Sequence, residues 1–238
     1  PSLSAALAIS TLGLSGALWA ASPNLSTEIV AEGLEHPWAM AFLPDGRYLV
    51  TERPGRMRIV QGDGRLGAPL AGLPAVEAAG QGGLLDVVLD SDFARNRQMY
   101  FCYSEPGSGA DSGKNSTALA SARLSDDASR LEQVKVLFSQ RTRYASALHF
   151  GCRIVERRVD GKSDGTLFLA LGERSRYKEE AQNLQSHLGK IVRIAKDGSV
   201  PRDNPFVGRA EAWPEIWSYG HRNAQGAALA PDGSLWMH

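Results

Sequence analysis

Three short segments of this sequence place a polar side chain among glycines at the edge of an apolar run. Gln81 lies within Gly-Gln-Gly-Gly, His149 precedes Phe-Gly, and Arg222 follows Gly-His. A histidine suits general base chemistry because its ordinary pKa lies near neutrality. An arginine in a glycine-flanked loop can hold a planar, oxygen-rich ligand through its forked guanidinium. If the strands lie around a common axis, a base, a fixed cation and an amide could converge at one site.

Glu173 is a fourth candidate, because it ends the apolar run that follows His149. A carboxylate at that point could orient an imidazole by accepting a hydrogen bond from it. Structural interpretations stay open for all four residues. His149 could bond a backbone carbonyl, Gln81 could be a turn residue, and Arg222 could form a surface ion pair. Glu173 could cap a loop or pair with Arg174.

The elements that must position these residues recur as a strand, an Asp-Gly turn, a second strand and a polar exit. Copies fall at residues 36–60, 84–104, 149–173 and 226–237, with further strands over 27–30 and 190–194. Such a repeat, at intervals of roughly 45 to 75 residues, predicts the blades of a β-propeller. An open β-sandwich of irregular hairpins is the alternative, which the matching turns disfavour. We predict an all-β fold with a partial propeller domain over 27–238, about three and a half blades long.

Propeller geometry would bring the candidate residues together. The innermost strand of each blade lines a central channel, and Gln81, His149 and Arg222 each lie just before or at such a strand. Their separation along the chain is then irrelevant, because the radial arrangement directs all three to one place. The last copy breaks off at His238 inside a hairpin, so we expect a C-terminal truncation.

Composition excludes some classes of partner and leaves the cysteines undecided. The 26 basic and 26 acidic residues balance, so no global field favours nucleic acid or an anionic membrane. Cys102 and Cys152 both lie in strand-like apolar runs, where buried free thiols are favoured over a bridge. No Cys and His spacing typical of a metal site occurs, so no metal ligand is assigned.

The N-terminal segment is typical of an export signal. Residues 3–21 are apolar and uncharged, and small residues follow up to position 22. This pattern predicts a signal peptide or a lipoprotein-type leader over 1–22, with a membrane span as the alternative. The mature chain would then hold no membrane span, and the protein would be periplasmic or secreted.

Seven motifs occur in order along the chain. They are His36-Pro37-Trp38-Ala39, Gly80-Gln81-Gly82-Gly83-Leu84-Leu85-Asp86, His149-Phe150-Gly151, Leu171-Gly172-Glu173, Gly189-Lys190, Asp203-Asn204-Pro205-Phe206 and Tyr219-Gly220-His221-Arg222-Asn223-Ala224-Gln225-Gly226. Together they resemble the soluble aldose sugar dehydrogenases that use pyrroloquinoline quinone (PQQ), a family that includes soluble glucose dehydrogenase and sorbosone-dehydrogenase-like proteins. The likeness runs from about Glu28 to the end of the chain. Each motif alone is weak, but seven in register are specific.

The resemblance implies a six-bladed propeller with the quinone over its central channel. His149 resembles the base that takes the proton of the sugar's anomeric hydroxyl, Gln81 the amide beside that hydroxyl, and Glu173 the acid that orients the histidine. Arg222 resembles the cation next to the quinone's reactive carbonyl. The remaining cofactor contacts that it implies are Asn223 and Gln225.

The implied reaction oxidises an aldose sugar to a lactone by hydride transfer to the quinone, with an external electron acceptor. Calcium would be a second cofactor, with ligands expected beyond His238, so the 238 residues by themselves are expected to be inactive. Leu148 stands where the family usually has a polar residue and Cys152 where it has Gly or Ser. These departures, with the charged loop 174–180, bear on substrate choice.

Two other functions remain open. A propeller could keep the scaffold as a non-catalytic binding module, since one fold serves several functions. A calcium-dependent lactonase on a similar propeller would need carboxylates and asparagine at the channel. The retained His149, Gln81 and Arg222 favour the dehydrogenase.

Overall fold

The fold was analysed in a computed structural model that describes residues 25–238. Three four-stranded antiparallel sheets follow one another along the chain, each with its strands paired in sequence order. The first blade comprises β1 (Pro37–Phe42), β2 (Tyr48–Glu52), β3 (Arg56–Val60) and β4 (Leu66–Pro69). The second comprises β5 (Leu84–Leu89), β6 (Gln98–Pro106), β7 (Asn115–Leu124) and β8 (Leu131–Ser139). The third comprises β9 (Gly151–Val159), β10 (Lys162–Leu171), β11 (Lys190–Ala195) and β12 (Ile216–Tyr219).

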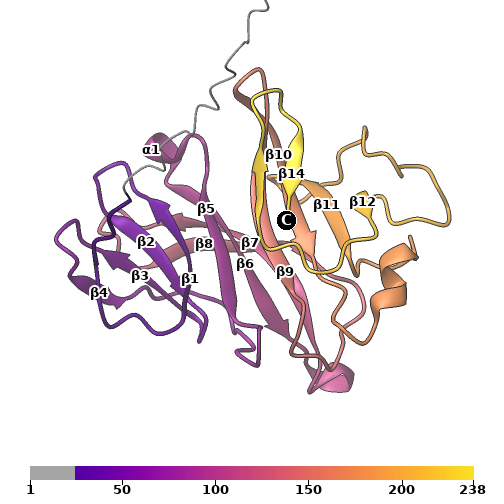
Figure 1. Ribbon diagram of the computed structural model, residues 1–238, viewed down its shortest axis with the longest axis horizontal. Coiled ribbons are helices and arrows are strands. Elements are labelled where there is room, and N and C mark those ends of the chain that lie inside the picture. Colours follow the sequence, from indigo (N-terminus) through magenta and orange to yellow (C-terminus); the bar gives the residue numbers. More distant parts are fainter. Residues whose placement is uncertain (1–24) are drawn as a thin grey trace, which may run out of the picture.

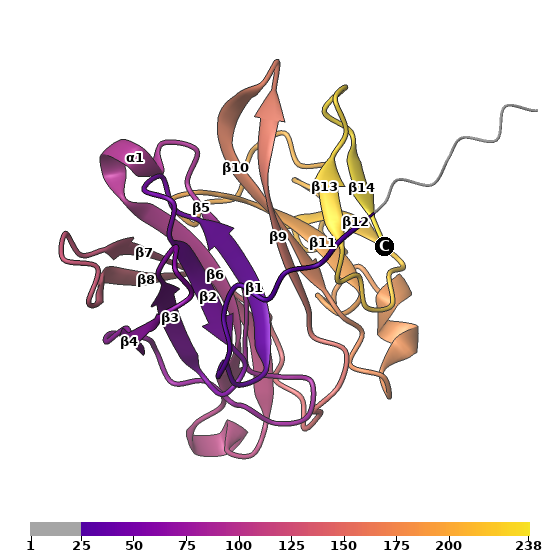
Figure 2. The same ribbon diagram turned by 60° about the vertical axis from the view of Figure 1, so that its left-hand side comes forward.

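A two-stranded hairpin of β13 (Ala227–Leu229) and β14 (Leu235–Met237) follows the third blade. Figure 1 shows the three blades side by side in chain order, and Figure 2 shows the hairpin beside β9. The first strands of successive sheets contact one another, β1 with β5, β5 with β9, and β9 with β13. This radial order confirms the predicted all-β fold of about three and a half blades.

Short helices occupy three of the connections. They are the α-helix α1 (Phe93–Asn96) and the 3₁₀ helices η1 (Gly109–Asp111) and η2 (Lys178–Gln182). Among residues 25–238, no helix is both long and apolar enough to cross a membrane. The predicted leader, residues 1–22, lies outside the described residues.

Asp-Gly turns close most of the hairpins as predicted, but α1 closes the hairpin of β5 and β6 without a glycine, and Asp164-Gly165 lies within β10. Gly46 joins β1 to β2 at φ +85°, a left-handed conformation that glycine adopts without a steric cost. The Asp45 carboxylate caps this turn by accepting a hydrogen bond from the Arg47 N–H at 3.2 Å. The turn between β9 and β10 is shorter than predicted, since β10 begins at Lys162.

Apolar side chains fill the interfaces between neighbouring sheets. Leu49, Met57, Leu84 and Phe101 are among those buried between the first and second blades. The interface of the second and third blades buries Leu85, Leu119, Leu169 and Val192, and Phe168 and Ile191 pack toward the final hairpin. Burial of both faces explains the nearly continuous apolar runs of middle strands such as β6, β10 and β11.

An ion cluster also joins the second and third blades. The ammonium of Lys196, which follows β11, lies 2.7 Å from Asp90 Oδ2 and also pairs with Glu156 of β9. Burial alone would raise the pKa of the Asp90 carboxyl, but hydrogen bonds from Lys196, a backbone amide and Tyr100 lower it to about 2. This cluster therefore adds to the stability of the interface between the two blades only while its carboxylates are ionised.

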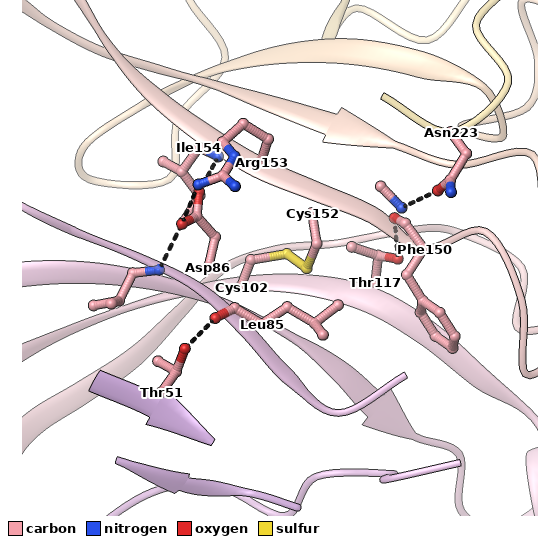
Figure 3. The surroundings of a disulfide bond; sticks show 12 residues. Thr51, Leu85, Asp86, Cys102, Thr117, Phe150, Cys152, Arg153, Ile154 and Asn223 are labelled. Atoms are coloured by element: carbon pink, nitrogen blue, oxygen red, sulfur yellow. Dashed lines mark hydrogen bonds and ion pairs between the residues drawn. A yellow bond between two sulfur atoms is a disulfide. The ribbon is translucent and has the colours of Figure 1, made fainter. Parts of the chain in front are cut away.

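Two sequence-based expectations were wrong. Residues 27–30 form no strand, and Ile29 is 76 % exposed because it has no strand partner among the described residues. Cys102 and Cys152, favoured as free thiols, form a disulfide with Cα atoms 5.6 Å apart (Figure 3). The pairing escaped prediction because residues 50 positions apart meet only when the second and third blades pack.

Candidate active site

His149 lies directly before β9 and is held through both its backbone and its ring. Its N–H donates to Gln81 Oε1 at 2.8 Å, and its Nδ1 lies 2.6 Å from Glu173 Oε1. An ionised carboxylate only accepts hydrogen bonds, so the hydrogen at this contact lies on Nδ1, and in the neutral ring Nε2 then carries the lone pair. The three residues come from different segments that the propeller brings together, as predicted.

The backbone around the histidine depends on close approach by a glycine. His149 has a left-handed φ of 53°, which is uncommon for a residue with a side chain. A Cβ on Gly172 would lie 1.9 Å from the His149 carbonyl oxygen, so only glycine allows the end of β10 to pass this close. The Gly-Glu pair after β10 is thus needed to bring the Glu173 carboxylate to the imidazole.

Glu173 occupies a buried position between His149 and Arg222. Its side chain is 3 % exposed, and its N–H donates to the Arg222 carbonyl at 2.8 Å. Arg222 Nε lies 3.8 Å from the same carboxylate oxygen, Oε1, that holds the imidazole. Oε2 is buried and has no hydrogen-bond partner among the described residues. The carboxylate therefore acts on the histidine and the arginine together rather than capping a loop.

The guanidinium of Arg222 faces solvent at the mouth of a hollow. The Arg222 side chain is 83 % exposed, so its donors are free to meet a ligand. The hollow measures about 550 Å³, within the range of small-molecule sites. Its lining residues are His149, Gly220, His221, Arg222, Asn223, Ala224, Met237 and His238.

The two other predicted cofactor contacts are placed differently. Asn223 lines the hollow, and its Oδ1 accepts a hydrogen bond from the Gly151 N–H at 3.0 Å, which leaves its NH₂ group for a ligand. Gln225 is exposed, and its backbone carbonyl accepts a hydrogen bond from Arg153 Nε at 2.8 Å. Gln225 is thus held through its backbone rather than by its side chain.

Two buried cations beside the site were not singled out from the sequence. Arg174 does not pair with Glu173; it is fully buried, its guanidinium carbon lies 3.7 Å from the centre of the Phe150 ring, and burial lowers its pKa to about 10. The ammonium of Lys190 donates to three backbone carbonyls, and burial lowers its pKa to about 8. The Gly-Lys motif was the only signal for Lys190, since charged residues in sequence usually indicate an exposed surface.

Residues 25–238 contain no cluster of three or more His, Cys, Asp or Glu placed to hold a metal ion. The hollow does fit the reactive end of a planar, oxygen-rich ligand. An exposed guanidinium, an amide donor and an imidazole whose Nδ1 is held by Glu173 are among its lining groups.

Comparisons with known proteins find relatives over most of the chain. The family model described as glucose/sorbosone dehydrogenase matches residues 34–238. Aldose sugar dehydrogenase YliI of Escherichia coli K12 is 47 % identical over 227 residues, which cover 94 % of this chain and 59 % of that protein.

Two solved structures of aldose sugar dehydrogenases are also similar to this chain. The apo form of the soluble aldose sugar dehydrogenase from Escherichia coli superposes with a TM-score of 0.81 and 46 % identity, over 88 % of this chain and 58 % of that one. The PQQ-bound aldose sugar dehydrogenase of Streptomyces coelicolor gives a TM-score of 0.72 and 27 % identity, over 88 % of this chain and 58 % of that one. The chain thus spans somewhat over half the length of these relatives.

Proposed function

The chain belongs to the glucose/sorbosone dehydrogenase family, and from this premise we propose that its complete gene product oxidises the anomeric hydroxyl of aldose sugars to lactones. PQQ would accept the hydride, and an external acceptor would reoxidise it. The observation that carries the proposal is the contact of His149 with both Gln81 and Glu173, beside the exposed Arg222. The chain spans 59 % of a sugar dehydrogenase relative, so we expect the 238 residues by themselves to be inactive.

The proposed chemistry follows from the state of the imidazole. His149 Nε2 accepts the hydroxyl proton, while Glu173 holds the Nδ1 hydrogen and stabilises the imidazolium that forms. Gln81 uses Oε1 to hold the His149 backbone, so its NH₂ group is free to bind the sugar hydroxyl. The bound quinone supplies a two-electron acceptor for the hydride.

Arg222 and Asn223 would hold the quinone in the hollow. The guanidinium of Arg222 would stabilise negative charge on a ligand oxygen, and this stabilisation grows as the oxygen gains charge during reduction. The Asn223 NH₂ group would donate to a second ligand oxygen, and Gln225 would contribute a further contact. We propose calcium as a second cofactor, with ligands beyond His238, and derive no step through it.

The experiment is reconstitution of the complete gene product. Protein supplied with PQQ and calcium should reduce a dye when glucose or another aldose is added, and a lactone should accumulate. Protein without PQQ and the His149→Ala variant loaded with PQQ are the controls. Tight PQQ binding without turnover on a panel of aldoses would favour a non-catalytic binding module. Lactone hydrolysis in its place would favour a lactonase, although no carboxylate lines the hollow.

We also propose that the protein is exported, to the periplasm or outside the cell. The apolar N-terminal segment 3–21 supports export, and so does the disulfide, since disulfides persist mainly in oxidising compartments. Fractionation of cells that express the complete gene, with thiol titration of the recovered protein, tests this. Protein found only in the cytoplasm with two free thiols would contradict it.

A further inference from the structure

The disulfide begins close to the candidate base along the chain. Cys152 is the third residue after His149 and lies in β9, whereas Cys102 lies in β6 of the preceding blade. Both cysteines are fully buried in the core between the second and third blades. Figure 3 shows the bond crossing this interface next to Leu85 and Phe150. It is therefore a covalent tie between two blades, and one of its ends lies three residues after the candidate base.

The backbone at Cys152 adopts a conformation that favours glycine. Its φ is 77°, in the left-handed region that side chains rarely adopt. The register between β9 and β10 shifts at the same point, so that Cys152 and Arg153 both lie opposite Ala170. This is a β-bulge, and bulges beside active sites redirect side chains. Some restraint must hold a cysteine in this conformation.

The residues on either side of Cys152 hold the loop that carries the proposed cofactor contacts. The Gly151 N–H donates to Asn223 Oδ1 at 3.0 Å. Arg153 donates to the Gln225 carbonyl at 2.8 Å. It also donates to Asp86 Oδ1 at 2.8 Å (Figure 3).

Asp86 itself is buried in β5, where it also accepts a hydrogen bond from the Ile154 N–H at 2.7 Å. The bulge thus connects the second blade with the loop that precedes β13. A shift of its backbone would move His149 and Asn223, which both line the hollow.

We propose that the Cys102–Cys152 disulfide is a positioning element of the active site. It holds the bulge in its left-handed conformation, and so keeps the His149 N–H on Gln81 and the Gly151 N–H on Asn223. Without the bridge, a free cysteine at 152 relaxes toward extended backbone and displaces both hydrogen bonds. The consequence for turnover rests on the proposed function, in which His149 is the base; the consequence for the two hydrogen bonds does not.

Three single variants of the complete gene product distinguish the effect of losing the disulfide from the effect of a changed backbone conformation at residue 152. Cys102→Ala and Cys152→Ala both remove the bridge and leave a side chain at the left-handed position. Cys152→Gly also removes the bridge, but glycine adopts the left-handed conformation freely. Thermal melts of all variants set an assay temperature at which each is folded. A bridge that acts only on stability would make the three variants alike in every assay at that temperature.

The expected result is a split between the variants. In both alanine variants, kcat per PQQ-loaded site falls about tenfold with little change in KM, because displacement of a base impairs proton transfer more than sugar binding. Cys152→Gly stays within about threefold of the parent, since its backbone needs no restraint. Equal kcat in the parent and all three variants, or a glycine variant as impaired as the alanine variants, would overturn the proposal.

Amide hydrogen exchange of the quinone-free protein provides a readout that needs no activity. We expect the His149 and Gly151 amides to exchange about tenfold faster in both alanine variants but not in Cys152→Gly. Unaltered exchange at both amides in the alanine variants would also overturn the proposal. If the parent protein does not oxidise sugar, the proposed function fails, while the exchange data still decide the role of the bridge.

Discussion

Neutralising Glu173 should slow sugar oxidation without weakening quinone binding. Its Oε1 is 2.6 Å from His149 Nδ1, and its side chain is 3 % exposed, so little water screens the pair. When the imidazole takes a proton, the two charges attract each other. At a separation of about 4 Å and an effective dielectric constant of about 20, that attraction is about 4 kcal/mol.

Each 1.4 kcal/mol, roughly, is a factor of ten in rate, so full loss of this attraction would cost about three orders of magnitude. Glu173→Gln keeps one oxygen that can accept the Nδ1 hydrogen, which offsets part of the loss. We therefore expect kcat to fall about 100- to 1,000-fold. Arg222 Nε lies 3.8 Å from the same oxygen, so removing the charge frees the guanidinium for the ligand. Quinone affinity should stay the same or increase.

The assay is dye reduction with glucose by the PQQ-loaded complete gene product, beside a spectroscopic titration with PQQ. Glu179→Gln is the matched control, because Glu179 is 89 % exposed and should leave kcat unchanged. Glu173→Asp keeps the charge but shortens the side chain, and should lose less than Glu173→Gln. A Glu173→Gln enzyme within threefold of the parent kcat would refute the reasoning.

The remaining predictions concern two site residues and one ion cluster. His149→Ala should lower kcat by about two to four orders of magnitude while PQQ still binds, and near-parental turnover with sugar would contradict its role as base. Arg222→Ala should weaken PQQ binding and slow quinone reduction by about 100-fold in stopped-flow assays; unaltered values of both would make Arg222 a structural residue. Lys196→Met should lower the free energy of unfolding by about 3 kcal/mol at pH 7, because it leaves a buried carboxylate unpaired. The folded pKa of Asp90, about 2, lies below its ordinary 3.8, so this stabilisation is present above pH 3.8 and is lost as pH falls through about 2. Denaturant unfolding at pH 7 and near pH 2 measures the free energy of unfolding that Lys196→Met loses. An equal loss at both pH values, or an equal loss in the exposed-site control Lys178→Met, would contradict this prediction.

The blade pattern could be predicted because its signals are local. Each Asp-Gly turn and its flanking apolar strands lie within a few residues of one another, and each turn requires the same left-handed glycine. Convergence of Gln81, His149 and Arg222 followed from that pattern alone, since a radial array of strands brings their starting points together. Residues 27–30 show the limit of this reasoning, because a short segment with β-branched residues forms a strand only where a partner edge is available.

What the sequence determined by itself was the fold class, the order of the blades and the residue types that meet at the channel. Only the tertiary structure decided how those residues are held. The link of Glu173 to both His149 and Arg222 depends on strand pairing within the third blade. The buried position of Arg174, which bonds Asn115, and the Cys102–Cys152 bridge depend on contacts between the second and third blades. A chain pattern encodes period and polarity along one strand, whereas these contacts are set by how strands pair and how neighbouring sheets pack.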